Sequence, residues 1–196
     1  MAKDVNPSTD YTREIAEREN QIDQLLKIIR EMALKDALTG IYNHANFHER
    51  LQSEIARAQR FSSQVSLILI DIDDFRKFNE QHGHIVGDQA LVVLGQIVRT
   101  YLRKYDIPAR YGGEEFAIIL PDATLEDAQK VAERIRQTVL EREIATGHAT
   151  THFSISSGIA HFPSHADSSM VLVACGEAAL QQAKQSGKNR VEIFVP

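Results

Sequence analysis

Val65-Ser-Leu-Ile-Leu-Ile-Asp-Ile-Asp73 is a short apolar run, rich in branched residues, that ends in acidic side chains. Its length and composition predict a buried strand over residues 65–71, followed by a short helix over residues 74–81. Side chains alternate along a strand, so Ile72 keeps to the core side between Asp71 and Asp73. The end of this strand can therefore aim carboxylates at a cleft.

The chain from Asp36 onward alternates between a helical period near 3.6 residues and short β-rich runs. Further helices are expected over residues 45–60, 87–101, 124–141 and 167–185, and further strands over residues 109–111, 116–120, 152–160 and 190–194. Gly112-Gly113 predicts the turn of a hairpin, and Thr124 with Asp127 resembles a capping box. The order β-α-β-β-α-β predicts an α+β fold of the ferredoxin-like or polymerase-palm type. Its central, mostly antiparallel sheet is expected to be flanked by helices, mostly on one face.

Composition and charge limit the classes of function. The chain has 196 residues, of which 43% are hydrophobic and 25% are charged, and its formal net charge is −5. These values fit one globular domain with an appendage. No dense Lys/Arg stretch interleaves with aromatic residues, so no extended nucleic-acid track is expected. The longest apolar run is far shorter than the roughly 20 residues of a membrane span, so no membrane contact is expected from this segment.

The single cysteine, Cys175, lies in an apolar helical stretch, where a small buried hydrophobe is the expected role. The chain opens with no signal peptide. Both features predict the reducing cytoplasm, for this chain by itself or as the cytoplasmic part of a larger, membrane-anchored protein.

The N-terminal segment differs from the rest of the chain. Residues 1–9 are expected to form a disordered tail, and residues 10–35 a helix that precedes the domain over residues 36–196. Ile15, Ile22 and Ile29 recur every seven residues, with Leu25 and Met32 three residues later. This seam, which Arg18 interrupts, predicts parallel pairing into a homodimer, with a single helix lying on its own domain as the alternative. A paired stalk would lead to an upstream sensory or receiver domain that this chain lacks.

Gly112-Gly113-Glu114-Glu115 is a second candidate site segment. Two glycines let the backbone approach a phosphate, and the acidic side chains supply the hard oxygen ligands that Mg²⁺ prefers. Alone, however, an acidic strand end is commonly a solvated turn, and Gly-Gly-Glu-Glu is commonly a hairpin. The sequence contains no G-x-x-x-x-G-K-[ST], which excludes a P-loop enzyme.

Together with their surroundings, these segments resemble the GGDEF family of diguanylate cyclases over essentially all of residues 36–196. The matching segments are residues 36–43 (DALTGIYN), 71–79 (DIDDFRKFN) with 83–84 and 87–88, 110–116 (RYGGEEF), 156–160 (SSGIA), and 183–184 with 187–189. Five segments in the same order are a specific signal. The resemblance implies an enzyme that condenses two GTP into cyclic di-GMP, a bacterial second messenger, and two pyrophosphates.

The resemblance also implies a catalytic set. Asp71, the Ile72 carbonyl and Glu114 would hold two Mg²⁺ or Mn²⁺ ions across the triphosphate, with Asp73 and Glu115 in supporting roles. Glu115 would also accept a proton. In two-metal chemistry one ion lowers the pKa of an attacking 3′-hydroxyl, and both ions clamp the phosphate in line. Each protomer of a homodimer would bind one GTP and attack the α-phosphate of the other.

Substrate contacts follow from the same resemblance. Free N–H groups at the start of the helix after Asp74 favour phosphate. The residues expected to contact the phosphates are Phe75, Arg76, Lys77, Gly112, Gly113, Lys184 and Lys188. Asn79 and Asp88 match the guanine-reading pair, because a carboxylate can accept from guanine N1–H and the 2-amino group. Adenine lacks both donors and would leave a buried acceptor unpaired at about 1–3 kcal/mol per group, which predicts GTP over ATP. Asp88 is also expected to cap a helix after Gly87.

Arg103-Lys104-Tyr105-Asp106 precedes the glycine turn at the spacing of the family's RxxD product-inhibition site. Arg134 matches the usual second arginine of that site. The planar fork of arginine pairs with phosphate oxygens or with guanine O6 and N7. The implied ligand is a stacked pair of cyclic di-GMP molecules that bridges domains and holds two active sites apart. Without the resemblance, Arg103 is a helix C-terminal charge and Asp106 a turn residue.

The chain departs from the family pattern at a few positions. Asn43-His44-Ala45 stands where Asn-Arg-Arg is frequent, Gln181 replaces a common tyrosine, and Glu80 and Glu177 stand where aspartate is usual. None of these changes removes an expected metal ligand or base-reading residue, so retuned or lowered activity is the most they predict. The sequence assigns no role to His44-Ala45.

Two other functions stay open. One is a catalytically silent sensor that binds GTP or cyclic di-GMP and signals to a partner, and the intact Asp71, Glu114 and Glu115 argue against it. The other is a different nucleotide cyclase with the same palm, and the Asn79–Asp88 pair argues for guanine instead. All three functions are compatible with the same fold, so only the site residues can distinguish them.

Overall fold

The structure is a computed structural model that describes residues 17–25, 34–147 and 149–196. Residues 17–25 are helical, and Ile22 and Leu25 are exposed there. The predicted tail over residues 1–9 and the heptad positions Ile15, Ile29 and Met32 lie outside the described residues. Pairing of this segment therefore stays a prediction. None of the helices in the described ranges is long and apolar enough to cross a membrane.

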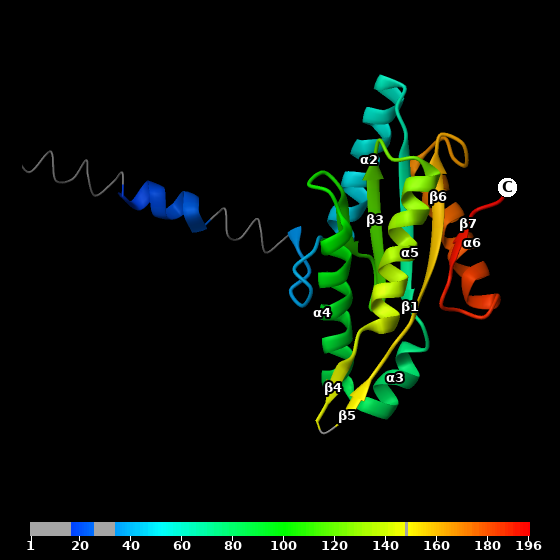
Figure 1. Ribbon diagram of the computed structural model, residues 1–196. Helices are drawn as coiled ribbons and strands as arrows, with labels where there is room; N and C mark the ends of the chain where they lie inside the picture. The colour runs from blue at the N-terminus through cyan, green and yellow to red at the C-terminus, as the bar shows by residue number, and fades with distance from the viewer. Residues whose placement is uncertain (1–16, 26–33, 148) are drawn as a thin grey trace, which may run out of the picture.

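Both helices and strands occur throughout the rest of the chain (Figure 1). The helices are α2 (His44–Phe61), α3 (Phe75–His82), α4 (His84–Tyr101), α5 (Leu125–Glu141) and α6 (Ser169–Gln185). The strands are β1 (Val65–Ile72), β2 (Ile107–Arg110), β3 (Glu115–Pro121), β4 (Ile144–Thr146), β5 (Ala149–Thr151), β6 (Ile155–Phe162) and β7 (Val191–Ile193).

The central sheet has five strands in the order β2-β3-β1-β6-β7. β1 pairs antiparallel with β3 on one side and with β6 on the other, while β7 joins the edge in parallel with β6. Every residue of β1 and β6 is buried. The predicted α+β fold, with a mostly antiparallel sheet flanked by helices, is confirmed.

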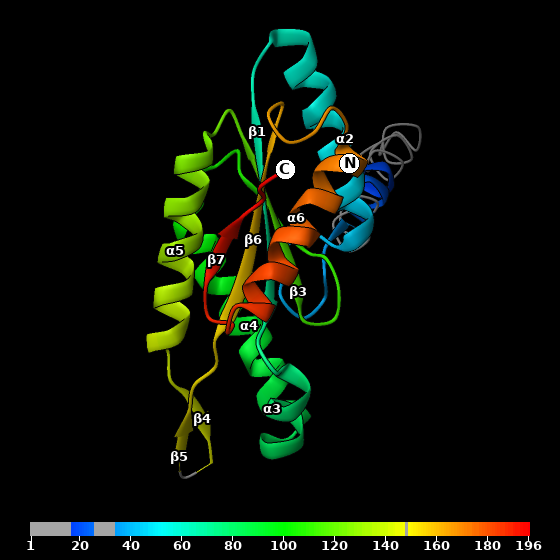
Figure 2. The same cartoon turned by 90° about the vertical axis from the view of Figure 1, so that its right-hand side faces the viewer.

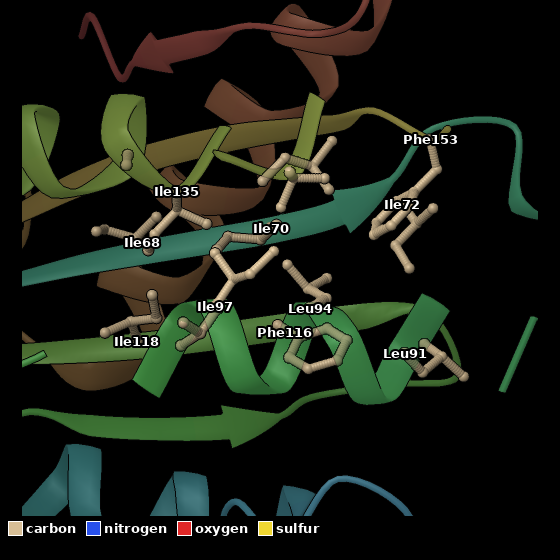
Figure 3. Close-up of a cluster of buried hydrophobic side chains, with 14 of the residues drawn as sticks. Ile68, Ile70, Ile72, Leu91, Leu94, Ile97, Phe116, Ile118, Ile135 and Phe153 are labelled. Carbon is tan, nitrogen blue, oxygen red and sulfur yellow. The ribbon is translucent and has the colours of Figure 1, made fainter. Parts of the chain in front are cut away.

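Helices cover both faces of this sheet, so the prediction that they lie mostly on one face is wrong (Figure 2). On one face, α4 and α5 pack against Ile68 and Ile70 of β1 (Figure 3). On the other face, α2 and α6 pack against Leu67 and Leu69. Because side chains alternate along a strand, β1 supplies both cores at once, which is why its sequence is an unbroken apolar run.

Several boundaries differ from those predicted. α4 begins at His84, with Gly83 before it, so Asp88 lies inside the helix and the prediction that it caps the helix is wrong. β6 begins at Ile155, three residues later than expected. The β4–β5 hairpin was not predicted, because strands of three residues are too short to show a period.

Local turn and cap signals were more reliable. Gly112-Gly113 lies in the turn between β2 and β3. Thr124 and Asp127 form the predicted capping box at the start of α5, in which each side chain accepts a hydrogen bond from the backbone N–H of the other. Cys175 is buried in α6, as predicted.

The backbone of α6 lies very close to the sheet at Gly158 of β6. A Cβ at position 158 would overlap backbone atoms of Leu180 and Gly176. A Cβ on Gly176 would instead meet side-chain atoms of Leu69, the nearest at 3.1 Å. Lys184 lies one turn beyond Leu180, so this backbone contact sets how far Lys184 reaches over the end of β1.

Gly158→Ala is expected to lower the free energy of unfolding by about 1–3 kcal/mol or more, because α6 must move away from the sheet. Gly176→Ala is the matched control. The Leu69 side chain can yield there, and alanine favours a helix over glycine by about 1 kcal/mol. Urea unfolding followed by circular dichroism measures both variants. Equal losses would show that the backbone contact at Gly158 does not hold α6 in place.

Candidate active site

The register of the central strands brings the two acidic segments together. Asp71 near the end of β1 pairs with Glu115 at the start of β3, and on its other side with Ser156 of β6. The backbone N–H of Ile72 donates to the carbonyl of Glu114 over 3.4 Å. Residues far apart in the sequence therefore present carboxylates and a main-chain carbonyl at one edge of the sheet.

Asp71 is a buried carboxylate with one cationic partner. Asp71 is 6% exposed, and Lys184 Nζ lies 2.8 Å from Asp71 Oδ2. The pKa of Asp71 is raised to about 6, chiefly by burial. The charges of Glu114 and Glu115 also act to raise it, and Lys184 acts to lower it. The carboxylate is therefore costly to ionise in the free protein, and a cation that replaces or adds to Lys184 favours its charged form.

Asp73, two residues further on, has a different environment. Its Oδ2 accepts from Ser154 Oγ at 2.6 Å and from the Asn189 backbone N–H at 3.0 Å, and its Oδ1 accepts from Ser156 Oγ at 2.6 Å. These bonds tie the end of β1 to the start of β6 and to the turn before β7. Asp73 thus holds these three segments together. Its hydrogen bonds come from Ser154, Ser156 and Asn189, and none of these contacts involves Glu114 or Lys184.

A cavity of about 320 Å³ lies over this edge and is lined by both acidic and basic groups. Its lining residues are Asp71, Ile72, Asp73, Asp74, Phe75, Arg76, Lys77, Glu114, Lys184 and Lys188. Lys188 Nζ lies 2.6 Å from Asp74 Oδ2, and Lys77 Nζ lies 3.3 Å from Asp74 Oδ1. Most of the predicted phosphate-binding and metal-binding residues therefore share one cavity, which also contains the start of α3.

A second cavity, of about 460 Å³, adjoins the first and shares Phe75, Arg76 and Glu114 with it. Asn79 and Asp88, the predicted base-reading pair, both line this second cavity. Asn79 Oδ1 is buried and has no hydrogen-bond partner. A Cβ on Gly87 would overlap that oxygen, so glycine there leaves room for the amide. A buried acceptor without a partner suits a ligand that brings N–H donors, as the edge of guanine does.

The glycine turn is held by a bridge that the sequence did not reveal. Arg110 donates to the Gly113 carbonyl, at 2.7 Å from Nη2 and 3.1 Å from Nε, and its Nη1 lies 3.1 Å from Asp36 Oδ2. Asp36 Oδ1 accepts from the Thr39 backbone N–H at 2.8 Å and from Thr39 Oγ1 at 2.6 Å. Burial acts to raise the pKa of Asp36, but the Thr39 hydrogen bonds and Arg110 outweigh it and hold the pKa below its ordinary value. Asp36 and Arg110 each open one of the matching segments, which is the signal that could have identified them.

The two glycines of the turn are not equivalent. A Cβ on Gly112 would overlap Glu115 Oε2, whereas a Cβ on Gly113 would meet nothing within 4 Å. Gly112 therefore leaves room for the Glu115 carboxylate beside the turn. The predicted role of Gly113 rests instead on its carbonyl, which Arg110 holds.

The predicted inhibitory residues lie where α4 and α5 meet the start of β2. Asp106 Oδ2 accepts from the Arg103 backbone N–H at 2.7 Å, which closes the loop between them. Tyr101 and Thr138 join the ends of α4 and α5 by a hydroxyl contact of 2.7 Å, and Arg134 is one turn before Thr138. Arg103 and Arg134 are both exposed. This region contains none of the residues that line the two cavities.

A family model described as "Diguanylate cyclase, GGDEF domain" matches residues 33–190. The chain belongs to the GGDEF family. Response regulator PleD of Caulobacter vibrioides is 37% identical over 185 residues, which cover 93% of this chain and 38% of PleD. Diguanylate cyclase DgcP of Pseudomonas aeruginosa is 33% identical over 186 residues, which cover 91% of this chain and 28% of DgcP. This GGDEF chain thus spans well under half the length of either curated relative.

Solved structures of GGDEF domains are also similar to this chain. The coiled coil and GGDEF domain of DgcB from Caulobacter crescentus, in complex with c-di-GMP, has a TM-score of 0.88 and 28% identity, covering 95% of this chain and 98% of that one. The active GGEEF domain of a diguanylate cyclase from Vibrio cholerae has a TM-score of 0.75 and 30% identity, covering 79% and 97%.

The raised pKa of Asp71 predicts a pH dependence of stability. In the metal-free folded state Asp71 keeps its proton up to about pH 6, whereas the unfolded chain loses it near 3.8. The folded state therefore binds more protons between these values, so stability falls as pH rises through this window. Asp71→Asn removes the titration and is expected to reduce that fall by about 2 kcal/mol.

Urea unfolding at pH 4.5 and pH 7, with a chelator present, compares the wild type with Asp71→Asn. Glu126→Gln, on the exposed surface of α5, is the control for loss of one carboxylate. The same fall in stability in wild type and Asp71→Asn would show that Asp71 is ionised throughout this range.

Proposed function

We propose that this GGDEF chain condenses two GTP into cyclic di-GMP and two pyrophosphates, as a homodimer with divalent metal ions. One observation carries the proposal. A buried carboxylate and basic side chains line one cavity, and Asn79 and Asp88 line a second cavity that adjoins it. Membership of the GGDEF family supports the same reaction.

Asp71, Glu114 and the Ile72 carbonyl are proposed to hold the metal ions. Within the described residues, no three His, Cys, Asp or Glu side chains are grouped closely enough to hold a metal ion. This donor set fits Mg²⁺, or Mn²⁺ with similar ligands, because Mg²⁺ is commonly held by one or two carboxylates and completes its shell with water and substrate phosphates. When bound, such ions lower the pKa of the attacking 3′-hydroxyl and offset the charge of the triphosphate.

The other side chains are proposed to bind and orient GTP. Lys184 and Lys188 offer two cations to the triphosphate, and both are paired with aspartates that the ligand complex can share or release. The start of α3 at Phe75, Arg76 and Lys77 adds backbone N–H groups and a positive dipole end. Asn79 and Asp88 accept from the guanine edge, which selects GTP over ATP by leaving acceptors unpaired when adenine binds.

The reaction joins two nucleotides, and each proposed site holds one. Two protomers must therefore face each other so that the 3′-hydroxyl on one can attack the α-phosphate on the other. Glu115, beside the turn, is proposed to accept the proton of that hydroxyl. Activity should then rise more steeply than in proportion to protein concentration in dilute solution.

Glu114→Ala is expected to lower cyclic di-GMP synthesis at least about 100-fold, because it removes a proposed metal ligand. The measurement is chromatography of the products after incubation of the whole chain with GTP and Mg²⁺. Glu126→Ala, an exposed carboxylate on α5, is the matched control and should keep full activity. If neither the wild type nor the control makes product while GTP or cyclic di-GMP still binds, the silent sensor becomes the better description.

Arg103→Ala is expected to relieve inhibition by cyclic di-GMP and to raise the concentration for half inhibition at least about 10-fold, since a charged fork to phosphate or guanine is lost. Lys104→Ala removes a neighbouring exposed charge and is the control. Initial rates at fixed GTP with added cyclic di-GMP provide the comparison. An unchanged half-inhibition concentration in Arg103→Ala would remove Arg103 from the inhibitory site.

A further inference from the structure

A pair of histidines lies at the start of α2, one helical turn apart. His44 Nε2 and His48 Nε2 are 3.2 Å from each other, and the two ring centroids are 4.6 Å apart. Both residues are exposed. His44 belongs to the Asn43-His44-Ala45 segment, where this chain departs from the frequent pattern of its family.

The distance between the nitrogens has two physical explanations. Two neutral imidazoles can share one hydrogen, with one ring donating and the other accepting. Two nitrogens that bind a tetrahedral ion at 2.0–2.1 Å are also about 3.3 Å apart, which follows from the tetrahedral angle. Histidines four residues apart on a helix are a recurrent metal-binding pair for this reason.

Two other histidines, His82 and His161, have ring nitrogens in contact with side chains from other elements or loops. His161 Nδ1 contacts Ser164 Oγ at 2.8 Å and its Nε2 contacts Gln64 Oε1 at 3.2 Å. His82 Nε2 contacts Thr151 Oγ1 at 3.2 Å. His44 Nε2 and His48 Nε2 point at each other from an exposed helix turn instead, so an ion can reach both.

Glu177 on α6 supplies an acidic group beside this pair. Tyr111 Oη donates to Glu177, and the Tyr111 ring packs against the rings of both His44 and His48, so the carboxylate lies near the pair. Glu177 is exposed and accepts from Tyr111 Oη at 3.2 Å, so its side chain can turn without breaking a buried contact.

We propose that His44, His48 and Glu177 bind one divalent transition-metal ion, such as Zn²⁺, between α2 and α6. The three side chains are not yet gathered around one point, in keeping with the lack of a preformed three-residue metal cluster in the described ranges, so Glu177 rotates to complete the site. The dipole at the start of α2 opposes a cation, and the Glu177 carboxylate offsets it. Imidazole ligands favour Zn²⁺, Ni²⁺ or Cu²⁺ over Mg²⁺, so this site is chemically distinct from the acidic cavity.

The position of the site connects it to the glycine turn. The Tyr111 ring lies 5.1 Å from His44 and 5.7 Å from His48, between centroids, and Tyr111 directly precedes Gly112. An ion that draws Glu177 to the histidines takes away the carboxylate to which Tyr111 donates. Metal binding therefore changes the surroundings of the residue that leads into the turn.

Isothermal titration of the whole chain with Zn²⁺, in the presence of excess Mg²⁺, tests the site without reference to activity. The wild type is expected to bind one Zn²⁺ with a rise in melting temperature, because an ion that binds only the folded state stabilises it. His44→Ala and His48→Ala should each weaken binding at least about 10-fold, and Glu177→Gln about 10-fold, as ligand losses do. His152→Ala, an exposed histidine in the loop before β6, and Glu114→Ala should leave Zn²⁺ binding unchanged.

Circular dichroism of each variant checks that the fold is intact. Zn²⁺ binding that is equal in the wild type and in both histidine variants would overturn the proposal. So would no binding by the wild type, which would leave His44 and His48 as a neutral hydrogen-bonded pair. Loss of Zn²⁺ binding in Glu114→Ala, with the histidine variants unaffected, would assign the ion to the acidic cavity instead.

Discussion

The antiparallel register of β1 against both of its neighbours is the constraint on which the two cores and the site depend. Asp71 lies beside Glu115 on one side and Ser156 on the other. Alternate residues of β1 face different helix layers, so a slip of one residue would exchange the two apolar faces and turn Asp71 away from Lys184. The packing that fixes the strand therefore also fixes which carboxylate is buried. Apolar packing along the whole length of β1 offsets the free-energy cost of burying a carboxylate at its end.

Elements with a strong local signal could be predicted from the sequence. The apolar run of β1, the glycine hairpin and the Thr124–Asp127 cap each depend on residues close in sequence, and the structure contains all three. The layer arrangement was predicted wrongly, although β1 contained the relevant signal. A strand that is apolar at every position has two buried faces, and this requires helices on both. The β4–β5 hairpin is too short for any period, and the start of α4 depends on Gly83 rather than on a capping side chain.

The site could be predicted as a set of residues but not as a set of contacts. Spacing and resemblance indicated the acidic strand end and the glycine turn, and the structure brings most of these residues to adjoining cavities. The Asp36–Arg110 bridge joins segments far apart in sequence, so no local pattern could reveal that it holds Gly113. His44 and Glu177 likewise looked like separate departures from a family pattern, and only the fold places both of them beside Tyr111.

Asp71 and Asp73 are the same residue type two positions apart, but their hydrogen-bond partners differ. Asp73 receives three hydrogen bonds from the protein and has no need of a ligand. Asp71 is buried with one lysine and neighbouring carboxylates, and its pKa rises to about 6. Asn79 Oδ1 adds a buried acceptor with no partner. The free protein thus keeps a buried carboxylate and an unpartnered acceptor at two adjoining cavities, and this lowers its stability. A ligand that brings cations to Asp71 and N–H donors to Asn79 removes both costs, and this gain adds to the free energy of its binding.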